Sequence, residues 1–308
     1  MSGMADPRMF QEVLDSATDQ ARLVEKTHQG TKPDAKAKQN EALAQWGRRK
    51  ATQERVERYV AGDPERTMGE RWVTMNNALA RAGHGLTLAE KRLVALAIST
   101  FDSATAKPDI NRPPHTRISA ADYAEVFGVS NDTAYDQLQS AAEHLFERKI
   151  TFYEAASKRA GKPLEPTKKV MRWVGQADYH KGEGWVELHW WPALLGALMG
   201  LKKNFTSYQL KQTSALRSIY SWRLLELLTR FKSTGWAQYS IEDFLVSMDA
   251  PPSLSDFGQV KRRIVTPAVT ELVQKDGWSI SWLPIKTGRK VTAIRFEFTR
   301  NDQQLSLL

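Results

Sequence analysis

Between residues 71 and 200, apolar positions change repeatedly between helical spacing and strand spacing. Thr87–Glu90 has the order of a capping box, in which the first side chain caps a helix and the acid reaches back, and apolar residues continue from it at helical period. Ser119–Asp122 predicts the start of a second helix, which Gly128 should end. A longer helix is expected from Asn131 to Arg148. The other runs are typical of strands: Arg117–Ile118, Ile150–Tyr153, Val170–Val174 and Trp185–Trp190.

The chain after residue 200 repeats this pattern. A strongly apolar helix is predicted over Leu216–Phe231, and a short strand over Trp236–Tyr239. Pro267 lies inside the last predicted helix, so that helix should kink there or divide into two segments. The remaining predicted elements are a cap at Ser240–Asp243, a cap-like quartet at Ser253–Asp256, a helix from Phe257 to about Gln274, and strands at Trp278–Ile285 and Lys290–Phe298 joined by Lys286–Arg289.

The two halves share one order of elements: a helix, a short strand, a second helix, a turn, a third helix and a two-stranded wing. The repeat is also local, because Ile118–Tyr123 (ISAADY) and Tyr239–Phe244 (YSIEDF) occupy the same place in that order. A repeated order of this kind indicates duplicated architecture. We therefore predict an α+β fold with two tandem winged-helix domains, at residues 71–200 and 201–300.

Residues 1–70 are rich in Ala, Gln, Lys, Arg and Glu, so we expect a helical or flexible N-terminal arm without its own core. The whole chain has 308 residues, and its ten tryptophans suggest aromatic-rich cores. It has no cysteine, which excludes disulfides and thiolate metal sites. No apolar run approaches the roughly 20 residues needed to span a membrane, and the first residues lack the order of a secretory signal. We expect a soluble intracellular protein.

The excess positive charge lies in the C-terminal third. The formal net charge is +9, and residues 201–300 supply +8 of it, from 16 Lys and Arg against 8 Asp and Glu. Residues 1–200 supply only +2, and Asp302 accounts for the last −1. Such a distribution favours a polyanionic partner for the second half, although a merely basic domain would show the same charge.

The basic residues lie where a winged helix would meet DNA. In a helix-turn-helix unit, the first helix braces a second helix whose N-terminal turns enter the major groove. Arginine reads guanine with two hydrogen bonds, whereas lysine more often neutralises phosphate. Three consecutive cations can also be an ordinary solvated face. The predicted DNA-binding residues of the second unit are Gln259, Lys261, Arg262 and Arg263 on the helix and Lys286, Arg289 and Lys290 at the wing tip.

The equivalent helix of the first unit has a mixed character. Asn131, Thr133 and Tyr135 can hydrogen-bond to bases or phosphates, but Asp132 and Asp136 would repel phosphate. We predict a weak DNA contact through Asn131, Thr133 and Tyr135, or a unit used partly for protein contacts. An ordinary capped, solvent-exposed face would show the same residues.

Five stretches carry a further signal: Ile118–Gly128, Phe205–Lys211, Ser218–Leu228, Lys261–Val269 and Lys286–Thr292. In this order they resemble the initiator proteins of bacterial plasmids, whose two winged-helix domains bind repeated origin sequences called iterons. The resemblance covers about residues 70–300, and Pro267 matches the family's pattern, whereas the long N-terminal arm departs from it. It implies a protein of the bacterial cytoplasm that binds iterons as a monomer, helps to melt the adjacent duplex, and represses its own gene as a dimer formed through the first domain. Implied partners are double-stranded and single-stranded origin DNA, a second copy of the chain, and the host replicative helicase, host initiator and sliding clamp.

The last residues resemble the short peptide with which bacterial proteins dock on the sliding clamp. A glutamine and spaced leucines can fill a small apolar pocket, although an ordinary chain end has the same composition. The predicted clamp-binding residues, within a tail at 301–308, are Gln304, Leu305, Leu307 and Leu308.

Two other functions compete with this interpretation. One is a transcriptional repressor that binds only an operator, because the fold serves both roles. The other is an enzyme, such as a nicking relaxase or a primase-helicase. The sequence has no phosphate-binding loop motif, and its six histidines include no His-x-His pair that would suggest a metal site. We therefore predict neither catalytic residues nor a metal or other cofactor.

Overall fold

The computed structural model describes residues 67–101, 109, 111, 113–154, 167–180, 183–254 and 256–300. The predicted arm at 1–70, apart from its last four residues, and the tail at 301–308 lie outside these ranges. One compact unit comprises residues 64–151 and 170–308 and contains both predicted winged helices. The other comprises residues 1–63 and 152–169, of which only 152–154 and 167–169 are described. None of the described helices combines the length and the apolar character that crossing a bilayer would require.

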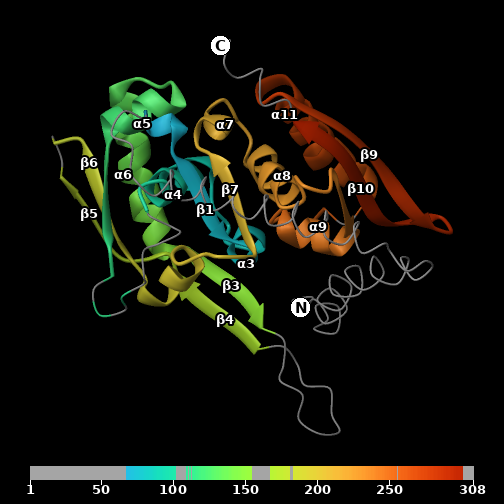
Figure 1. Ribbon diagram of the computed structural model, residues 1–308, viewed down its shortest axis with the longest axis horizontal. Helices are drawn as coiled ribbons and strands as arrows, with labels where there is room; N and C mark the ends of the chain where they lie inside the picture. The colour runs from blue at the N-terminus through green and yellow to red at the C-terminus, as the bar shows by residue number, and fades with distance from the viewer. Residues whose placement is uncertain are drawn as a thin grey trace, which may run out of the picture. The chain divides into compact units, whose positions relative to one another are not determined.

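The first winged helix is built on a three-stranded antiparallel sheet whose strand order is β2-β6-β5 (Figure 1). Helix α4 begins at the predicted capping box, in which Thr87 and Glu90 bond reciprocally. Helix α5 ends at Gly128 in the left-handed conformation, as expected. The elements are α4 (Leu88–Ile98), β2 (His115–Ser119), α5 (Ala120–Phe127), α6 (Asn131–Glu147), β5 (Val174–His180) and β6 (Trp185–Trp190).

An additional two-stranded sheet is inserted between α6 and the wing of this unit. It consists of β3 (Lys149–Glu154) and β4 (Thr167–Arg172). The single strand predicted at Val170–Val174 is therefore wrong: β4 ends at Arg172, and Val174 already belongs to the wing strand β5. The two strands are separated at Trp173, whose side chain is fully buried.

The second winged helix has the same topology, with strand order β8-β10-β9. In both units the last strand of the wing lies at the centre of the sheet, so the duplicated architecture is confirmed. The elements are α8 (Ile219–Thr229), β8 (Trp236–Ser240), α9 (Ile241–Ser247), α10 (Phe257–Val260), a π-helical turn (Lys261–Val265), α11 (Thr266–Lys275), β9 (Trp278–Thr287) and β10 (Lys290–Arg300).

The repeated hexapeptide adopts one local structure in both units. Ser119 accepts a hydrogen bond from the backbone N–H of Asp122 and donates to its carboxylate at 2.7 Å. Ser240 makes the same pair of contacts with Asp243, again at 2.7 Å to the carboxylate. Each cap satisfies an N–H group that the helix itself leaves unpaired, which explains why these helices begin where they do.

The predicted cap at Ser253–Asp256 is placed too early. The side chain that caps α10 is that of Asp256, which accepts from the backbone N–H of Gln259 at 3.0 Å. The helix therefore begins at Phe257, as predicted, but its cap is the last residue of the quartet instead of the first.

Two strands far apart in the sequence form a sheet that the local pattern does not reveal. Strand β1 (Trp72–Asn76) pairs with β7 (Phe205–Gln209), with Trp72 opposite Gln209. Short helices follow each strand, α3 (Asn77–Arg81) and α7 (Lys211–Ser214). Strand β7, which follows the boundary predicted between residues 200 and 201, therefore pairs with the first strand of the first unit.

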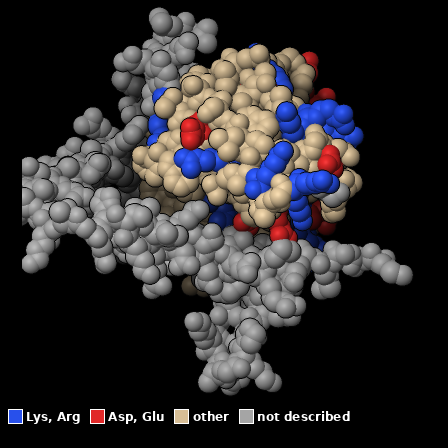
Figure 2. All heavy atoms as spheres, turned by 90° about the vertical axis from the view of Figure 1, so that its right-hand side faces the viewer, with Lys and Arg blue, Asp and Glu red and all other residues tan. Residues whose placement is uncertain are grey.

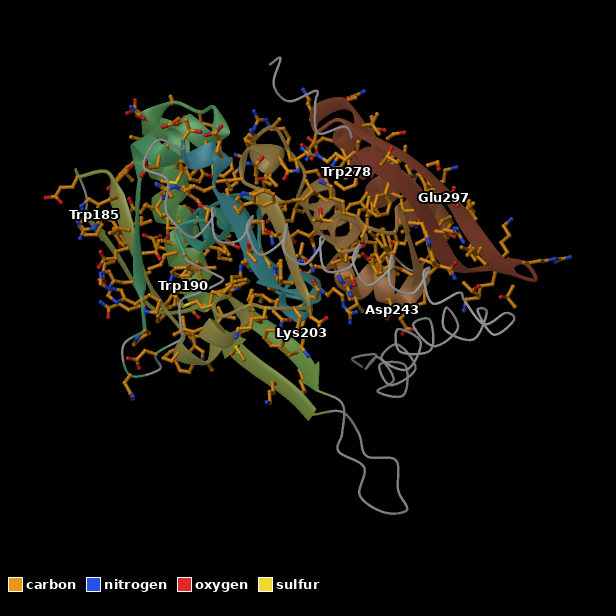
Figure 3. The ribbon with its side chains drawn as sticks, viewed as in Figure 1. Trp185, Trp190, Lys203, Asp243, Trp278 and Glu297 are labelled. Atoms are coloured by element: carbon orange, nitrogen blue, oxygen red, sulfur yellow. The ribbon has the colours of Figure 1, made fainter. Side chains whose placement is uncertain are left out.

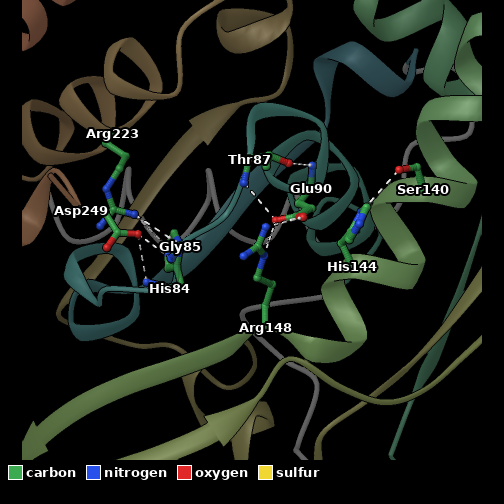
Figure 4. A network of polar contacts seen from close by, with 9 residues as sticks. All are labelled: His84, Gly85, Thr87, Glu90, Ser140, His144, Arg148, Arg223 and Asp249. Atoms are coloured by element: carbon green, nitrogen blue, oxygen red, sulfur yellow. Dashed lines mark hydrogen bonds and ion pairs between the residues drawn. The ribbon is translucent and has the colours of Figure 1, made fainter. Parts of the chain in front are cut away.

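Buried polar contacts join the two winged helices (Figure 4). Arg223 of α8 is 1% exposed and donates to the carbonyl groups of Ala82 and Ser247 and to the ring of His84. Asp249, just after α9, accepts from the backbone N–H groups of His84 and Gly85. These groups come from both halves of the chain, and His84 and Arg223 are buried, so their mutual hydrogen bonds fix how the two winged helices meet.

His84 should make stability depend on pH. Its burial lowers its pKa well below the usual range, and Arg223 and Lys91 lower it further. The unfolded chain binds a proton at this position near pH ~6.5, whereas the folded chain does not. The free energy of unfolding should therefore fall as the pH drops below about 6.5, by at most about 1.4 kcal/mol per pH unit, until the pKa of the folded state is reached.

The measurement is urea unfolding of the wild type and of His84→Gln between about pH 7 and pH 5. Glutamine retains an acceptor for Arg223 but does not titrate, so the variant should lose this part of the pH dependence. His144→Gln changes an exposed histidine on α6 and should leave it unchanged. Equal slopes for His84→Gln and the wild type would contradict the assignment.

Candidate nucleic-acid interface

The helix that follows the turn in each unit is called its reading helix: α6 in the first unit, and α10, the π-helical turn and α11 in the second. The reading helix of the second unit has one buried face and one basic face. Every fourth residue from Val260 to Leu272 is fully buried, together with Val265. Lys261, Arg262 and Arg263 are exposed, and Gln259 is half-buried. The buried face packs on α8, the first helix of this unit. As predicted, the three cations point away from the core.

A π-helical turn reconciles this helix with Pro267. Proline lacks an N–H group and its ring crowds the carbonyl of the residue four positions earlier. The turn over Lys261–Val265 widens the helix just before the proline, with the N–H of Thr266 bonded to the carbonyl of Lys261. The helix therefore continues as α11 and is not divided into separate segments. Such π turns are rare and occur frequently at functional sites.

The wing of the second unit ends in a tight turn that carries three cations. Thr287 pairs with Lys290, so only Gly288 and Arg289 form the turn. Gly288 has a φ of 61°, which suits the first central position of a two-residue hairpin turn and disfavours a larger side chain. Lys286, Arg289 and Lys290 are all exposed. The predicted hairpin is confirmed, although β9 extends two residues further than expected.

An aromatic contact connects the helix to the wing. The rings of Phe257 in α10 and Trp282 in β9 lie 6.4 Å apart. The Nζ of Lys261 lies 5.8 Å from the centre of the same Trp282 ring, within range of a weak cation–π contact. The start of the basic helix and the wing strand therefore share one side of the unit. Figure 2 views the molecule from the side of β9 and β10 and shows Lys and Arg side chains gathered on one half of that face.

None of the six cations on this helix and wing forms an ion pair with any residue that the structure describes. Other arginines of the unit are engaged: Arg300 contacts Asp276 at 2.7 Å, and Arg295 contacts Glu297 at 3.2 Å. A cation without a carboxylate partner is free to neutralise a phosphate group. We call Lys261, Arg262, Arg263, Lys286, Arg289 and Lys290 the basic cluster.

A buried contact at the base of the wing was missed by the sequence analysis. Asp276 is 1% exposed and accepts hydrogen bonds from the Nε1 of Trp278 and the Nη2 of Arg300, both at 2.7 Å. It joins the end of α11 to Trp278, the first residue of β9, which Figure 3 labels, and to the last residue of β10. The contact therefore holds the wing in a fixed direction relative to the reading helix. Asp276 and Arg300 are 24 residues apart in the sequence, and no local motif marks their contact.

The reading helix of the first unit offers a poorer surface for DNA. Asn131 and Thr133 are exposed, but so are Asp132 and Asp136. The hydroxyl of Thr133 is already bonded to Ser130 at 2.8 Å. Tyr135 is half-buried, and its hydroxyl is buried with no hydrogen-bond partner among the residues that the structure describes, so it does not point to solvent as a DNA contact would require. The structure thus presents Asn131 and Thr133 at the surface and turns Tyr135 inward.

Known proteins share the sequence and fold of this chain. Residues 72–229 match the family described as Initiator Replication protein, WH1, and residues 240–298 match Initiator Rep protein, WH2. An uncharacterized 27.6 kDa protein of Escherichia coli is 26% identical over 215 residues, 66% of this chain and 85% of that protein. The PI protein of Escherichia coli is 24% identical over 261 residues, 75% of this chain and 82% of that protein.

A solved structure supports the fold. The crystal structure of the Pi initiator protein in complex with iteron DNA has a TM-score of 0.62 to this chain at 20% identity, and the match covers 76% of this chain and 99% of that one. At this identity the similarity establishes the fold, two winged helices joined as described above. Because the WH1 match alone spans half of the residues, the chain belongs to the family of initiator replication proteins with WH1 and WH2 domains.

Proposed function

We propose that this protein starts replication of a bacterial plasmid by binding iteron repeats in the origin, mainly through its second winged helix. The observation that carries the proposal is the basic cluster, which is exposed and unpaired among the described residues. The family match supports the role of initiator, and a similar protein was crystallised with iteron DNA. The reading helix would enter a major groove while the wing tip contacts the flanking backbone.

The two winged helices would have unequal roles. The second, placed at residues 201–300, would be the main DNA-binding domain. The first, at 71–200, would make a weaker DNA contact through Asn131 and Thr133 and would support dimerisation. We propose these domain limits together with these roles. We further propose that the protein melts the adjacent duplex, contacts single-stranded origin DNA, and recruits the host helicase and host initiator. It would also repress its own gene and act in the bacterial cytoplasm.

Replication in cells discriminates this function from that of a repressor. A plasmid that carries the origin should be maintained when the gene is supplied and lost when it is removed. A pure repressor would leave replication unchanged and alter only transcription from its operator. In the proposed mechanism the protein cleaves no bond. Nicking of supercoiled origin DNA by the pure protein would therefore contradict it and would indicate an enzyme.

Lys290→Ala should weaken binding evenly across DNA sequences. Lys290 lies at the wing tip, where contacts to phosphate do not depend on the base. We expect the slope of log K against log salt to decrease in magnitude by about 1, since one phosphate contact is lost. Fluorescence anisotropy at several salt concentrations, with iteron DNA and scrambled DNA, measures both effects. A loss confined to iteron DNA would show that Lys290 reads a base.

We also propose that the C-terminal residues Gln304, Leu305, Leu307 and Leu308 dock on the host sliding clamp. They lie outside the described residues, so the proposal rests on the sequence alone. Deletion of residues 304–308 should abolish capture of the clamp in a pulldown and leave iteron affinity unchanged. Equal clamp capture by the full-length and shortened chains would refute it.

A further inference from the structure

The outer face of the sheet in the first wing gathers histidine and carboxylate side chains from three strands. His189 on β6 lies opposite His115 on β2. In the next row, Glu187 on β6 lies opposite Asp178 on β5. The alternate residues of β6, Val186 and Leu188, are buried on the other face. Four potential metal ligands therefore share one surface.

Three of them lie close enough together to share one cation. The Nε2 of His189 lies 3.1 Å from a carboxylate oxygen of Asp178 and 3.5 Å from one of Glu187. All three donor atoms lie within 4.8 Å of one another. Ligands held ~2.0–2.2 Å from a tetrahedral Zn²⁺ are separated by roughly 3.3–3.5 Å. Little rearrangement is therefore needed to place a cation between them.

Neighbouring side chains hold the two carboxylates in place. The amide of Gln176 donates to both oxygens of Asp178, each at 2.9 Å. Arg117 binds the other oxygen of Glu187 at 3.1 Å and stacks over the ring of Trp185, which Figure 3 marks at the start of β6. Supporting contacts of this kind orient the ligands of metal sites. They also leave the facing oxygens of both acids directed at the same imidazole nitrogen.

Two carboxylates directly opposite each other on antiparallel strands repel, and a cation between them would offset this repulsion. The side chains of Asp178, Glu187 and His189 are 41%, 16% and 33% exposed, so ions can reach them. His115 is also exposed, and its ring centre lies 5.6 Å from that of His189. It is thus near enough to supply a fourth ligand after a change of rotamer.

We propose that Asp178, Glu187 and His189 bind Zn²⁺, with His115 or a water molecule as the fourth ligand. Imidazole together with carboxylate favours zinc over Mg²⁺, which prefers oxygen ligands alone. The bound ion would clamp β5 to β6 and add positive charge to a wing whose two strands each carry one acid. The site departs from the sequence-based expectation of no metal because its ligands include no His-x-His pair and come from two strands. It does not depend on the proposed initiator function.

The test is isothermal titration calorimetry of the full chain, without an affinity tag, with ZnCl₂ and separately with MgCl₂. We expect saturable binding of Zn²⁺ at a single site, a higher Tm in the presence of Zn²⁺, and no such response to Mg²⁺. His189→Ala and Asp178→Asn should each weaken Zn²⁺ binding by about tenfold or more. His144→Ala removes an exposed histidine of α6 and is the matched control, with unchanged affinity.

Absence of saturable Zn²⁺ binding would overturn the proposal, and so would binding that His189→Ala and Asp178→Asn leave unchanged. Asp178→Asn preserves the size of the side chain and one of the two hydrogen bonds that it accepts from Gln176, so it decides the question if His189→Ala does not fold. Circular dichroism of each variant establishes folding before titration. If His144→Ala weakens binding as strongly as Asp178→Asn, the metal lies elsewhere and the assignment to the first wing fails.

Discussion

Glu226→Gln should destabilise the protein by about 3–5 kcal/mol, because it removes one partner of a buried ion pair. Glu226 of α8 is 0% exposed and lies 2.7 Å from the Nζ of Lys91 of α4, which is 1% exposed. The same carboxylate accepts a hydrogen bond from the hydroxyl of Tyr208 at 2.8 Å. Without the carboxylate, the ammonium group of Lys91 would be left in the core with no opposite charge.

A double variant separates the ion pair from mere packing. Lys91→Met combined with Glu226→Gln removes both charges, while the glutamine retains an acceptor for Tyr208. Its free energy of unfolding should recover most of the loss, because neutral replacement of a buried pair is often tolerated. Urea unfolding of the wild type, both single variants and the double variant measures the coupling. A Glu226→Gln variant within about 1 kcal/mol of the wild type would contradict the role of the pair.

The burial of Lys91 explains why this effect should be large. Burial lowers the pKa of Lys91, and Glu226 opposes that shift. The pair connects α4 and α8, the first helices of the two winged helices. Loss of stability should therefore extend to the relative arrangement of both winged helices.

Arg262→Ala and Arg263→Ala should weaken binding to iteron DNA by about 1–3 kcal/mol each where the side chain reads a base. Both arginines are exposed on the widened turn of the reading helix and have no carboxylate partner in the described part of the chain. The loss should fall mainly on iteron DNA, because base contacts determine specificity, and much less on scrambled DNA.

Lys275→Ala provides the matched control for these variants. Lys275 is an exposed cation at the far end of α11, away from the turns that we propose enter the groove. Its removal should change iteron affinity little. If Arg262→Ala, Arg263→Ala and Lys275→Ala all bind iteron DNA as the wild type does, the interface lies on another surface.

Local signals in the sequence predicted much of the fold. The helix caps Thr87, Ser119 and Ser240 and the turn glycines Gly128 and Gly288 determine only the conformation of neighbouring residues. The helices and turns that they begin or end could therefore be placed from the sequence. The wing strands β9 and β10 were predicted from alternating apolar positions. Strand β5 was mostly missed because its residues after Val174 include Gly, Ala and Asp, which have low strand propensity.

Contacts between distant segments could not be predicted in this way. The pairing of β1 with β7 and the ion pair of Lys91 with Glu226 join residues between 129 and 137 positions apart. The inward position of the Tyr135 hydroxyl depends on how α6 packs, which spacing does not specify. The π turn before Pro267 was not predicted either, because the sequence is compatible both with a kinked helix and with two separate segments.

The basic cluster was the part of the candidate site that the sequence predicted best. Three consecutive cations near the start of a helix face outward when the apolar residues on either side of them are buried in the core. What the sequence lacked was the support behind them: Asp276 and Arg300 at the base of the wing, and Trp282 against Phe257 and Lys261.

Footprinting of the purified protein on the origin of its own plasmid tests the central claim most directly. The account predicts several protected sites that share a sequence and recur at a regular spacing, and it predicts that Arg262→Ala combined with Arg263→Ala abolishes them at the same protein concentration. A single isolated site, no protection, or a pattern that the double variant leaves unchanged would contradict it.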